Sequence, residues 1–214
     1  MDKNTILNAI KKVREISKKR NFQQTFDLVI SLKNFQIKKN ESRIDNFITL
    51  PHGRGKKLRI CALVDQVMAK KATDFDKVIV KEQFNEYKNK NEMRKLASEY
   101  DFFVAQANLM GPIATTFGRV FGPRGKMPNP KAGCVVPPEI ELKPVYEKLQ
   151  RTVRMTTKGE PSIKVPVGTE TMKDEAIVEN ILAIYNNLLS LLPEEKNNIN
   201  KVIIKLTMSQ GVII

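Results

Sequence analysis

The pattern of hydrophobic and polar residues changes twice along the chain, and these changes divide it into three parts. Near each end, apolar residues alternate with polar ones in short stretches, which is typical of strands that are buried on one face only. In the middle, the short apolar stretches are continuous, as expected for strands buried on both faces of a parallel sheet. The sequence therefore predicts two kinds of sheet.

The N-terminal part is predicted to hold one helix and two alternating strands. Apolar residues at helical spacing, with basic residues on the other faces, indicate a helix that ends near Asn21. These apolar residues are Ile6, Leu7, Ile10, Val13 and Ile16. Residues 25–32 predict a half-buried strand, residues 35–42 a polar loop, and residues 43–50 a second strand. The following segment, 51–57 (PHGRGKK), predicts a hinge or a domain boundary.

The middle part is predicted to alternate strands with helices. Residues 60–64, 78–80 and 102–105 are the continuously apolar strands, and the spacings between them leave room for helices. One helix is expected over residues 83–98 and another over residues 137–150. This alternation favours a small three-layer α/β domain.

A stretch rich in glycine, proline and basic residues lies between these two helices, at 118–134 (GRVFGPRGKMPNPKAGC). It holds four glycines and three prolines, and no acidic residue occurs between Asp101 and Glu139. Its cations are Arg119, Arg124, Lys126 and Lys131. We expect an ordered loop through which neither a helix nor a strand continues. It either only connects two elements or binds phosphate through its cations and backbone N–H groups.

The C-terminal part returns to alternating strands, over residues 153–155 and 162–167. Thr171, followed three residues later by Asp174, predicts the start of a helix. The apolar positions of that helix are Ile177, Ile181, Leu182, Tyr185, Leu188 and Leu189. Residues 201–208 predict a last strand.

These elements together predict a discontinuous architecture. Residues 1–57 and 155–214 are expected to form an α+β domain with an antiparallel sheet and two helices. Residues 58–154 are expected to form an inserted, Rossmann-like three-layer α/β domain with a parallel sheet. Two chain crossings between the domains would allow them to move relative to each other.

The charge of the chain points to a polyanionic partner. The 37 Lys and Arg residues against 23 Asp and Glu give a net charge of +14, with an isoelectric point near 9.8. The net charge is +9 over residues 1–57, +6 over 58–154 and −1 over 155–214. Such an excess favours binding to nucleic acid. The alternative is a basic surface that serves solubility alone.

Several classes of protein are disfavoured by composition. His52 is the only histidine, and Cys61 and Cys134 match no zinc or redox spacing, so we expect no metal, no cofactor and reduced thiols in the cytoplasm. The apolar runs are too short to span a bilayer and no secretory signal is evident at the start, so no membrane partner is expected.

Two segments approach nucleotide-binding motifs without completing them. In residues 53–58 (GRGKKL), Leu58 replaces the third glycine of a dinucleotide fingerprint, and the glycines precede the strand. At the 122–127 segment (GPRGKM), Val120 replaces the first glycine of a phosphate loop and Met127 the hydroxyl residue that would hold magnesium. Four carboxylates stand at predicted strand ends: Asp65, Asp74, Asp76 and Asp101. Such residues more often serve solubility than catalysis, so an enzyme is not expected.

Three motifs, in this order, resemble the archaeal form of ribosomal protein L-one, the stalk protein of the large subunit: LPHGRGK at 50–56, FGPRGKMPNPKAG at 121–133 and VPVGTETM at 165–172. The resemblance covers essentially the whole chain. It implies a protein with an inserted second domain, monomeric when free, whose terminal domain binds the stalk helices of large-subunit rRNA. It also implies a role in release of exit-site tRNA, repression of translation through binding to its own mRNA, and a cytoplasmic location on the large ribosomal subunit.

The resemblance also implies a set of RNA-binding residues. They are Phe22, Thr25, Ser162, Lys164, Gly168, Thr169, Thr207, Met208 and Ser209. His52, Arg54 and Lys56 are added because a loop of glycines and cations, here 52–57, is expected to bind backbone phosphate without reading sequence. Secondary phosphate contacts are expected from Arg119, Arg124, Lys126 and Lys131. The chain departs from the family where many members have TMGP, because it has TMSQG from Thr207 onward. That change puts close packing of the backbone against RNA at this point in question.

Two other functions stay open beside the ribosomal one. The first is an RNA chaperone or regulator of the same fold that acts away from the ribosome, which co-sedimentation with large subunits would distinguish. The second, and least favoured, is a degenerate nucleotide-dependent enzyme, which a nucleotide-binding assay would test.

Overall fold

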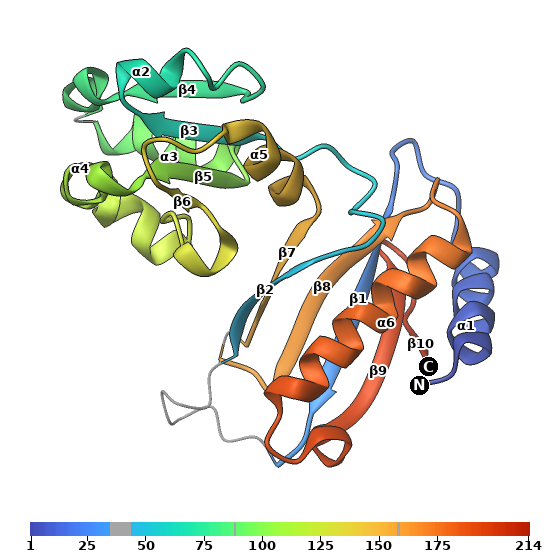
Figure 1. The fold of residues 1–214 in the computed structure, drawn as a ribbon. Helices are drawn as coiled ribbons and strands as arrows, with labels where there is room; N and C mark the ends of the chain where they lie inside the picture. The colour runs from blue at the N-terminus through green and yellow to red at the C-terminus, as the bar shows by residue number, and fades with distance from the viewer. Residues whose placement is uncertain (35–43, 88, 158) are drawn as a thin grey trace. The chain divides into compact units, whose positions relative to one another are not determined.

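The computed structural model describes residues 1–34, 44–87, 89–157 and 159–214. It divides into two compact units, and Figure 1 shows both chain termini in the first of them. Unit 1 consists of Met1–Lys56 and Arg151–Ile214, and unit 2 is Lys57–Gln150. The first crossing lies within one residue of its expected place. The second lies at Gln150 and not at Arg154, because residues 152–156 form a strand that pairs within unit 1.

The main sheet of unit 1 is antiparallel, with the strand order β10-β9-β1-β8. Its strands are β1 (Thr25–Leu32), β8 (Ser162–Thr169), β9 (Ile199–Leu206) and β10 (Val212–Ile213). A separate two-stranded sheet pairs β2 (Asp45–Thr49) with β7 (Thr152–Thr156). The predicted polar loop at 35–42 and the predicted strand start at residue 43 lie outside the described residues.

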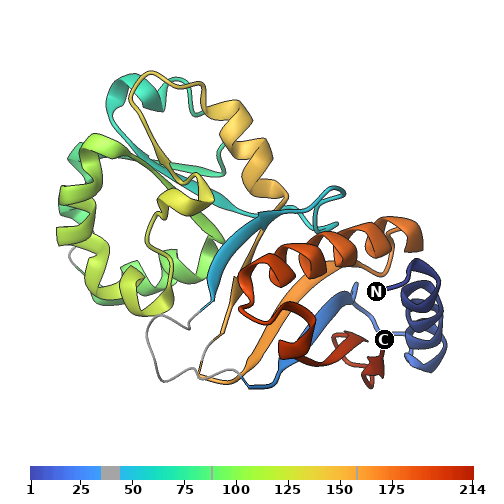
Figure 2. The same cartoon turned by 60° about the horizontal axis from the view of Figure 1, so that its bottom comes forward.

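Two helices cover one face of the main sheet in Figures 1 and 2: α1 (Lys3–Ile16) and α6 (Asp174–Leu191). The alternate residues of β1, Phe26, Leu28 and Ile30, are at most 1% exposed and belong to the same core as Ile10 and Ile181 of the helices. A short 3-10 helix, η5 (Glu195–Asn198), follows α6. The alternation therefore predicted the buried face of the sheet correctly.

Unit 2 contains a parallel sheet with the strand order β4-β3-β5-β6. Its strands are β3 (Ile60–Val64), β4 (Lys77–Val80), β5 (Phe102–Gln106) and β6 (Val135–Val136). Every residue of β3 is buried, as its continuous apolar run predicted. The fold class, an antiparallel α+β part and a parallel α/β part, is confirmed.

The helices of unit 2 are α2 (Gln66–Ala69), α3 (Lys90–Glu99), α4 (Met110–Arg124) and α5 (Leu142–Gln150). Short 3-10 helices accompany them among the described residues: η2 (Lys81–Glu86), η3 (Ala107–Leu109) and η4 (Pro130–Ala132). In Figure 2, α4 and α5 lie on opposite sides of the unit's strands. Phe117 and Phe121 of α4 stack on each other and pack with Phe103 of β5, which fixes α4 against the sheet.

The prediction of a continuous loop over 118–134 was wrong for its first part, because α4 runs on to Arg124. Burial of Phe117, Val120 and Phe121 outweighs the low helix propensity of the glycines and of Pro123, which lies in the last turn. The helix ends at Gly125, which has a φ of +63°, and Lys126 N–H donates to the Phe121 carbonyl (2.9 Å).

Other predicted boundaries also differ from the structure. The helix predicted over 83–98 is wrong as a single element, because η2 and α3 are separate and Asn89 caps α3 by accepting from Asn91 N–H (3.0 Å). Thr171 is not the cap of α6, whose cap position is Lys173, although Asp174 does lie in the first turn.

The ends of three predicted elements shift inward. Helix α1 ends at Ile16, before Asn21, and α5 begins at Leu142 instead of residue 137. Strand β9 ends at Leu206, where the Ser209 hydroxyl accepts from Leu206 N–H (2.8 Å) and closes a turn. Residues 207 and 208 therefore belong to the turn and not to the strand.

Candidate nucleic-acid interface

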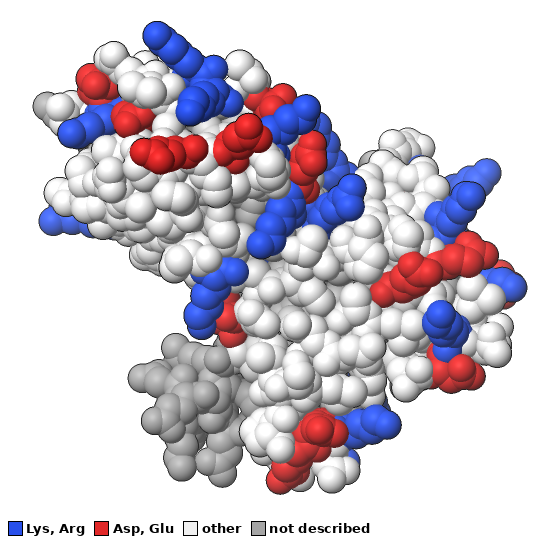
Figure 3. Space-filling model, in the orientation of Figure 1, with Lys and Arg blue, Asp and Glu red and all other residues white. Residues whose placement is uncertain are grey.

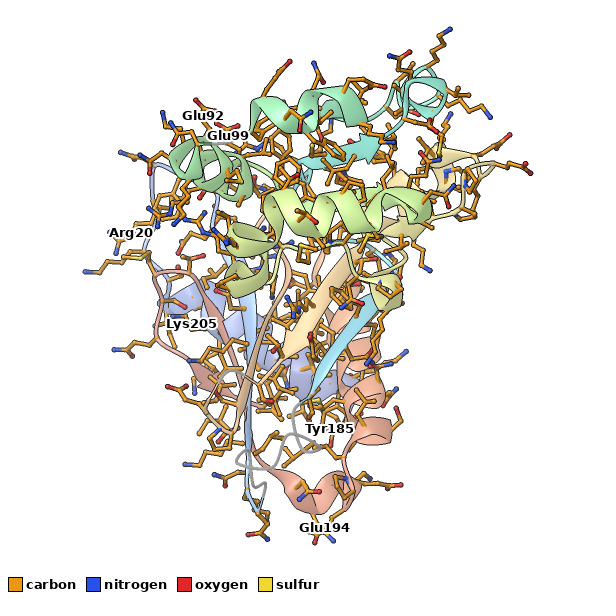
Figure 4. All side chains as sticks on the ribbon, turned by 90° about the vertical axis from the view of Figure 1, so that its left-hand side faces the viewer. Arg20, Glu92, Glu99, Tyr185, Glu194 and Lys205 are labelled. Atoms are coloured by element: carbon orange, nitrogen blue, oxygen red, sulfur yellow. The ribbon has the colours of Figure 1, made fainter. Side chains whose placement is uncertain are left out.

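The main sheet of unit 1 has a second face, opposite to its helices, that carries half-buried and exposed residues. These residues are Asp27, Val29 and Ser31 on β1, Ser162, Lys164 and Pro166 on β8, and Lys201, Ile203 and Lys205 on β9. We call this surface the open face. Figure 4 shows Lys205 and Arg20 on one side of unit 1 and Tyr185, from α6, on the other.

The charged residues of the open face are three lysines, Lys164, Lys201 and Lys205, and one acidic residue, Asp27, which lies near cations. Asp27 lies opposite Lys205 on β9, and Arg54 is also close enough to favour its charged form. Burial is the larger effect and raises the pKa of Asp27 above its usual value of 3.8. By contrast, the helix-covered face in Figure 3 shows acidic side chains beside basic ones over unit 1. A polyanion would therefore be attracted to the open face more than to α6, whose charged residues, Asp174, Glu175 and Glu179, are all acidic.

Three threonines meet at one end of the open face, where Thr25 is half-buried, Thr207 is exposed and Thr169 is buried (2% exposed), and we call this place the threonine end. Thr25 begins β1 and lies opposite Thr169, the last residue of β8. The Thr207 hydroxyl accepts from Thr25 N–H (3.1 Å) and donates to the Thr25 carbonyl (3.3 Å). The structure thus brings together three residues predicted from segments more than 30 positions apart.

Two exposed apolar side chains accompany these hydroxyls. Phe22 is 51% exposed, three residues before β1, and Met208 is 59% exposed, directly after Thr207. The buried side chain of Gln24 links the turn that carries Met208 to the end of α1. Its Oε1 accepts from Met208 N–H (3.2 Å), and its Nε2 donates to the hydroxyl of Ser17, which follows α1 (3.2 Å). Exposed apolar groups beside a polar sheet end suit a partner that offers both sugars and bases.

The TMSQG departure fits the turn after β9. Ser209 does not have a positive φ, and its hydroxyl accepts from Leu206 N–H, so a side chain is accommodated there. The position that excludes a side chain is Gly211, where a Cβ would lie 2.6 Å from Cγ2 of Ile203. The backbone at Gly211 therefore lies too close to Ile203 for any other residue, whereas the Ser209 hydroxyl stabilises the turn that contains Met208.

The segment at 51–57, here the 51–57 loop, is attached to unit 1 by the fully buried Asn180 of α6. The Asn180 amide donates to the carbonyls of Gly53 and Val167 (2.8 Å each) and accepts from His52 N–H (3.1 Å). The His52 ring contacts Glu179 on the surface (2.5 Å), and this hydrogen bond lowers the pKa of Glu179. His52 is thus partnered within unit 1, which the sequence did not indicate.

Glycines allow this loop to approach the threonine end closely. Gly55 has a φ of +70°, and a Cβ there would lie 2.5 Å from the Thr169 hydroxyl and 2.6 Å from the Met172 sulfur. Gly168 is also enclosed, with Met172 and Ile177 beside it. The contacts place the cationic loop, with Arg54 half-buried and Lys56 exposed, next to the threonine end.

Ser162 and Lys164 do not join this cluster. Ser162 lies opposite Ser31 at the far end of β1, about 20 Å along that strand from the Thr25–Thr169 pair at 3.4 Å per residue. Lys164 lies opposite Val29, on the open face, and pairs with Glu160 (3.3 Å). Both residues share the open face with Asp27, but at a distance from the threonine end.

The four predicted phosphate contacts of unit 2 form no single loop. Arg119 and Arg124 lie on α4 and line a hollow, whereas Lys126 donates to the carbonyls of Tyr100 and Asp101 (2.9 Å each). Lys131 lies on η4, and the described residues that line the hollow include neither it nor Lys126. The continuation of α4 as a helix is what separates these cations.

The described residues show neither a metal-binding cluster nor a helix suited to a membrane. No group of three or more His, Cys, Asp or Glu side chains is placed there to hold a metal ion. In the same parts of the chain, no helix has both the length and the hydropathy needed to cross a membrane.

Comparison with known proteins gives a consistent result. The profile of the ribosomal protein L1p/L10e family matches residues 11–210. Large ribosomal subunit protein uL1 of Methanocaldococcus jannaschii is 40% identical over 214 residues, which cover 99% of this chain and 95% of the relative. The protein of the same name from Nanoarchaeum equitans is 43% identical over 213 residues, with 96% and 97% covered. That from Methanothermobacter thermautotrophicus is 39% identical over 210 residues, with 97% of each covered.

Proposed function

Because the chain belongs to the ribosomal protein L1p/L10e family, we propose that it is a large-subunit ribosomal protein whose unit 1 binds the stalk region of rRNA. Its relatives carry the names of ribosomal proteins and not of enzymes. The open face and the threonine end are the surface proposed to bind the RNA.

The observation that carries this proposal is the convergence at the threonine end. Hydroxyls of Thr25 and Thr207, exposed apolar side chains of Phe22 and Met208, and a cationic loop meet at one edge of an ordered sheet. Structured RNA is recognised through 2′-hydroxyls, phosphates and unstacked bases, which need this mixture of groups. Because backbone hydrogen bonds hold the three segments, the surface is organised before RNA binds.

Each group has a different role in the proposed complex. The cations of the 51–57 loop and the lysines of the open face attract phosphates without reading sequence. The threonine end contacts ribose and backbone, and Met208 fills an irregular hollow in the RNA. Asp27 accepts hydrogen bonds from the RNA. Because phosphates repel a carboxylate, its favourable contacts are with donors such as 2′-hydroxyls or base amino groups.

The direct test is binding to a transcript of the stalk region at several salt concentrations. We expect the logarithm of the association constant to fall linearly with the logarithm of salt, by about 0.7 to 0.9 per phosphate contact. Replacing Arg54 and Lys56 by Gln should flatten that slope. Affinity that does not depend on salt, or a protein that does not co-sediment with large subunits, would refute the proposal.

We further propose two finer roles on the same surface. The protein represses translation by binding a stalk-like structure in its own mRNA, and it takes part in the release of exit-site tRNA. Repression through the same surface requires that the stalk transcript and the messenger leader compete for one site. Simultaneous binding of both RNAs would exclude the shared surface. Release is tested by comparing the rate of tRNA departure from ribosomes with and without the protein.

A further inference from the structure

Unit 2 contains a concentrated group of cations on the surface between α3 and α4. A hollow of about 450 Å³ is lined by Lys90 and Arg94 of α3 and by Arg119, Val120, Pro123 and Arg124 of α4. We call it the cationic hollow. Its lining residues include four positive charges and no carboxylate, and no ion pair found among the described residues involves any of the four.

Charge on α3 is separated by face. Lys90 and Arg94, four residues apart, line the cationic hollow, whereas Glu92, Lys95 and Glu99 line a different hollow beside Lys77 and Tyr87. Figure 4 shows Glu92 and Glu99 together on α3. The acidic residues therefore balance cations elsewhere and leave those of the cationic hollow uncompensated. Like charges at such short spacing repel one another, so the free protein bears a cost that a bound anion would remove.

The cationic hollow also has a fixed wall. The Arg124 guanidinium donates to the Arg94 carbonyl (2.7 Å) and the Ser98 hydroxyl (2.8 Å), so it joins the end of α4 to α3. Beneath it, the stacked Phe117 and Phe121 hold α4 on the sheet. Lys90, Arg94 and Arg119 therefore project from two helices whose separation is set by the core.

A second hollow of about 350 Å³ adjoins the first and shares Lys90 and Arg119 with it. Its other lining residues are Phe84, Asn85, Tyr87, Met93, Thr115 and Thr116. Hydroxyls, an amide and a half-buried tyrosine ring thus continue from the cations along one groove. A nucleic acid offers phosphates for the cations, and sugars and bases for the hydroxyls, the amide and the tyrosine ring beside them. A run of acidic side chains would contact the cations alone.

We propose that the groove formed by the two hollows is a second RNA-binding surface, with a phosphate held between α3 and α4 and the adjoining nucleotide beside Tyr87 and Thr116. The inference rests on the proposed function in that it names an RNA partner for unit 2 as well. The phosphate belongs to rRNA or to tRNA, and the experiment separates these sources.

The experiment compares two full-length variants with equal loss of charge. R94Q/R119Q removes two cations of the cationic hollow and leaves Arg124, which joins the helices, in place. K71Q/K95Q removes two exposed lysines of unit 2 that lie outside it. Affinities for polyuridylate, deacylated tRNA, a stalk transcript and polyglutamate are measured over a range of salt, together with the melting temperature of each protein.

We expect R94Q/R119Q to melt at the parent's temperature or above it, because repulsion is relieved, and yet to bind polyuridylate several-fold more weakly. Its salt slope should be flatter by about 1.4, the value for two lost contacts with single-stranded RNA. The K71Q/K95Q slope should change by less than half as much. If R94Q/R119Q also binds tRNA more weakly than the parent but not the stalk transcript, the phosphate belongs to tRNA. If it binds the stalk transcript more weakly but not tRNA, the phosphate belongs to rRNA.

Three results would overturn the inference: equal slopes for the two variants, a lower melting temperature with unchanged affinity, or an equal loss of polyglutamate binding. The last would identify a surface for acidic polypeptides. Met208→Ala, measured in parallel on the stalk transcript, keeps the two proposals distinct. If Met208→Ala binds like the parent, the proposed site on unit 1 fails, whatever R94Q/R119Q does.

Discussion

Replacing Asn180 by Ala should destabilise unit 1 more than any surface change, because a single buried amide holds three segments. Its two N–H bonds go to the carbonyls of Gly53 and Val167, and its oxygen accepts from His52 N–H. Each such bond contributes about 1 kcal/mol net, and buried groups left without a partner cost about 1–3 kcal/mol each. With the cavity left by the side chain, the expected loss is about 3–5 kcal/mol.

Denaturant unfolding of the variant measures this loss, and Asn186→Ala is its matched control. Asn186 lies on the same helix but is exposed, so the control should change stability by less than about 0.5 kcal/mol. Because Asn180 also fixes the 51–57 loop, RNA affinity should fall even under conditions where the variant is fully folded. A loss of stability under 1 kcal/mol would refute the role assigned to Asn180.

Three further predictions test other parts of the structure. Burial raises the pKa of Asp27, so its carboxylate destabilises the fold at neutral pH, and this cost disappears as the pH falls through the raised pKa to 3.8. Asp27→Asn should therefore have a higher melting temperature than the parent at pH 7 and the same melting temperature near pH 3.5. An equal difference in melting temperature at both pH values would exclude the linkage. Gly55→Ala should lower the free energy of unfolding by denaturant by roughly 1 kcal/mol more than Gly159→Ala does. Gly159 also has a positive φ, but a Cβ there would meet open space, so equal losses would mean that the contact with Thr169 is unimportant. A chain in which a short linker replaces Lys57–Gln150 should unfold cooperatively and bind the stalk transcript, and a broad, gradual melt would show that unit 1 depends on unit 2.

The sequence predicted elements best where one physical signal dominated. Alternation in β1 follows directly from burial of Phe26, Leu28 and Ile30 on one face, so its bounds and buried face were predictable. The continuous apolar run of β3 was equally clear. Helix α4 was missed because its glycines and Pro123 imply a loop, while the burial of Phe117 and Phe121 that stabilises the helix depends on strands distant in sequence.

The candidate site was predictable only in part, for a similar reason. Motif resemblance supplied Thr25, Thr169 and Thr207, and the sheet register explains why they meet. Asp27 was missed because an acidic residue on an alternating strand resembles any solvent-facing residue; its importance appears only from the cations that tertiary structure brings near it. The contact of His52 with Glu179 and the anchoring by Asn180 likewise depend on where α6 lies, which local sequence does not specify.

The measurement that tests the central claim most directly is the affinity of Met208→Ala for the stalk transcript, with its melting temperature as the companion measurement. Met208 is 59% exposed, so the substitution should leave stability within about 0.5 kcal/mol of the parent. If the Met208 side chain packs into a hollow of the RNA, Met208→Ala should bind the transcript more weakly by about 1–3 kcal/mol, or roughly 5- to 150-fold, with the salt slope unchanged. Val67→Ala, an exposed apolar residue of unit 2 (70%), should bind like the parent. Unchanged affinity in Met208→Ala, or a loss matched by Val67→Ala, would contradict the assignment of the threonine end as the RNA site.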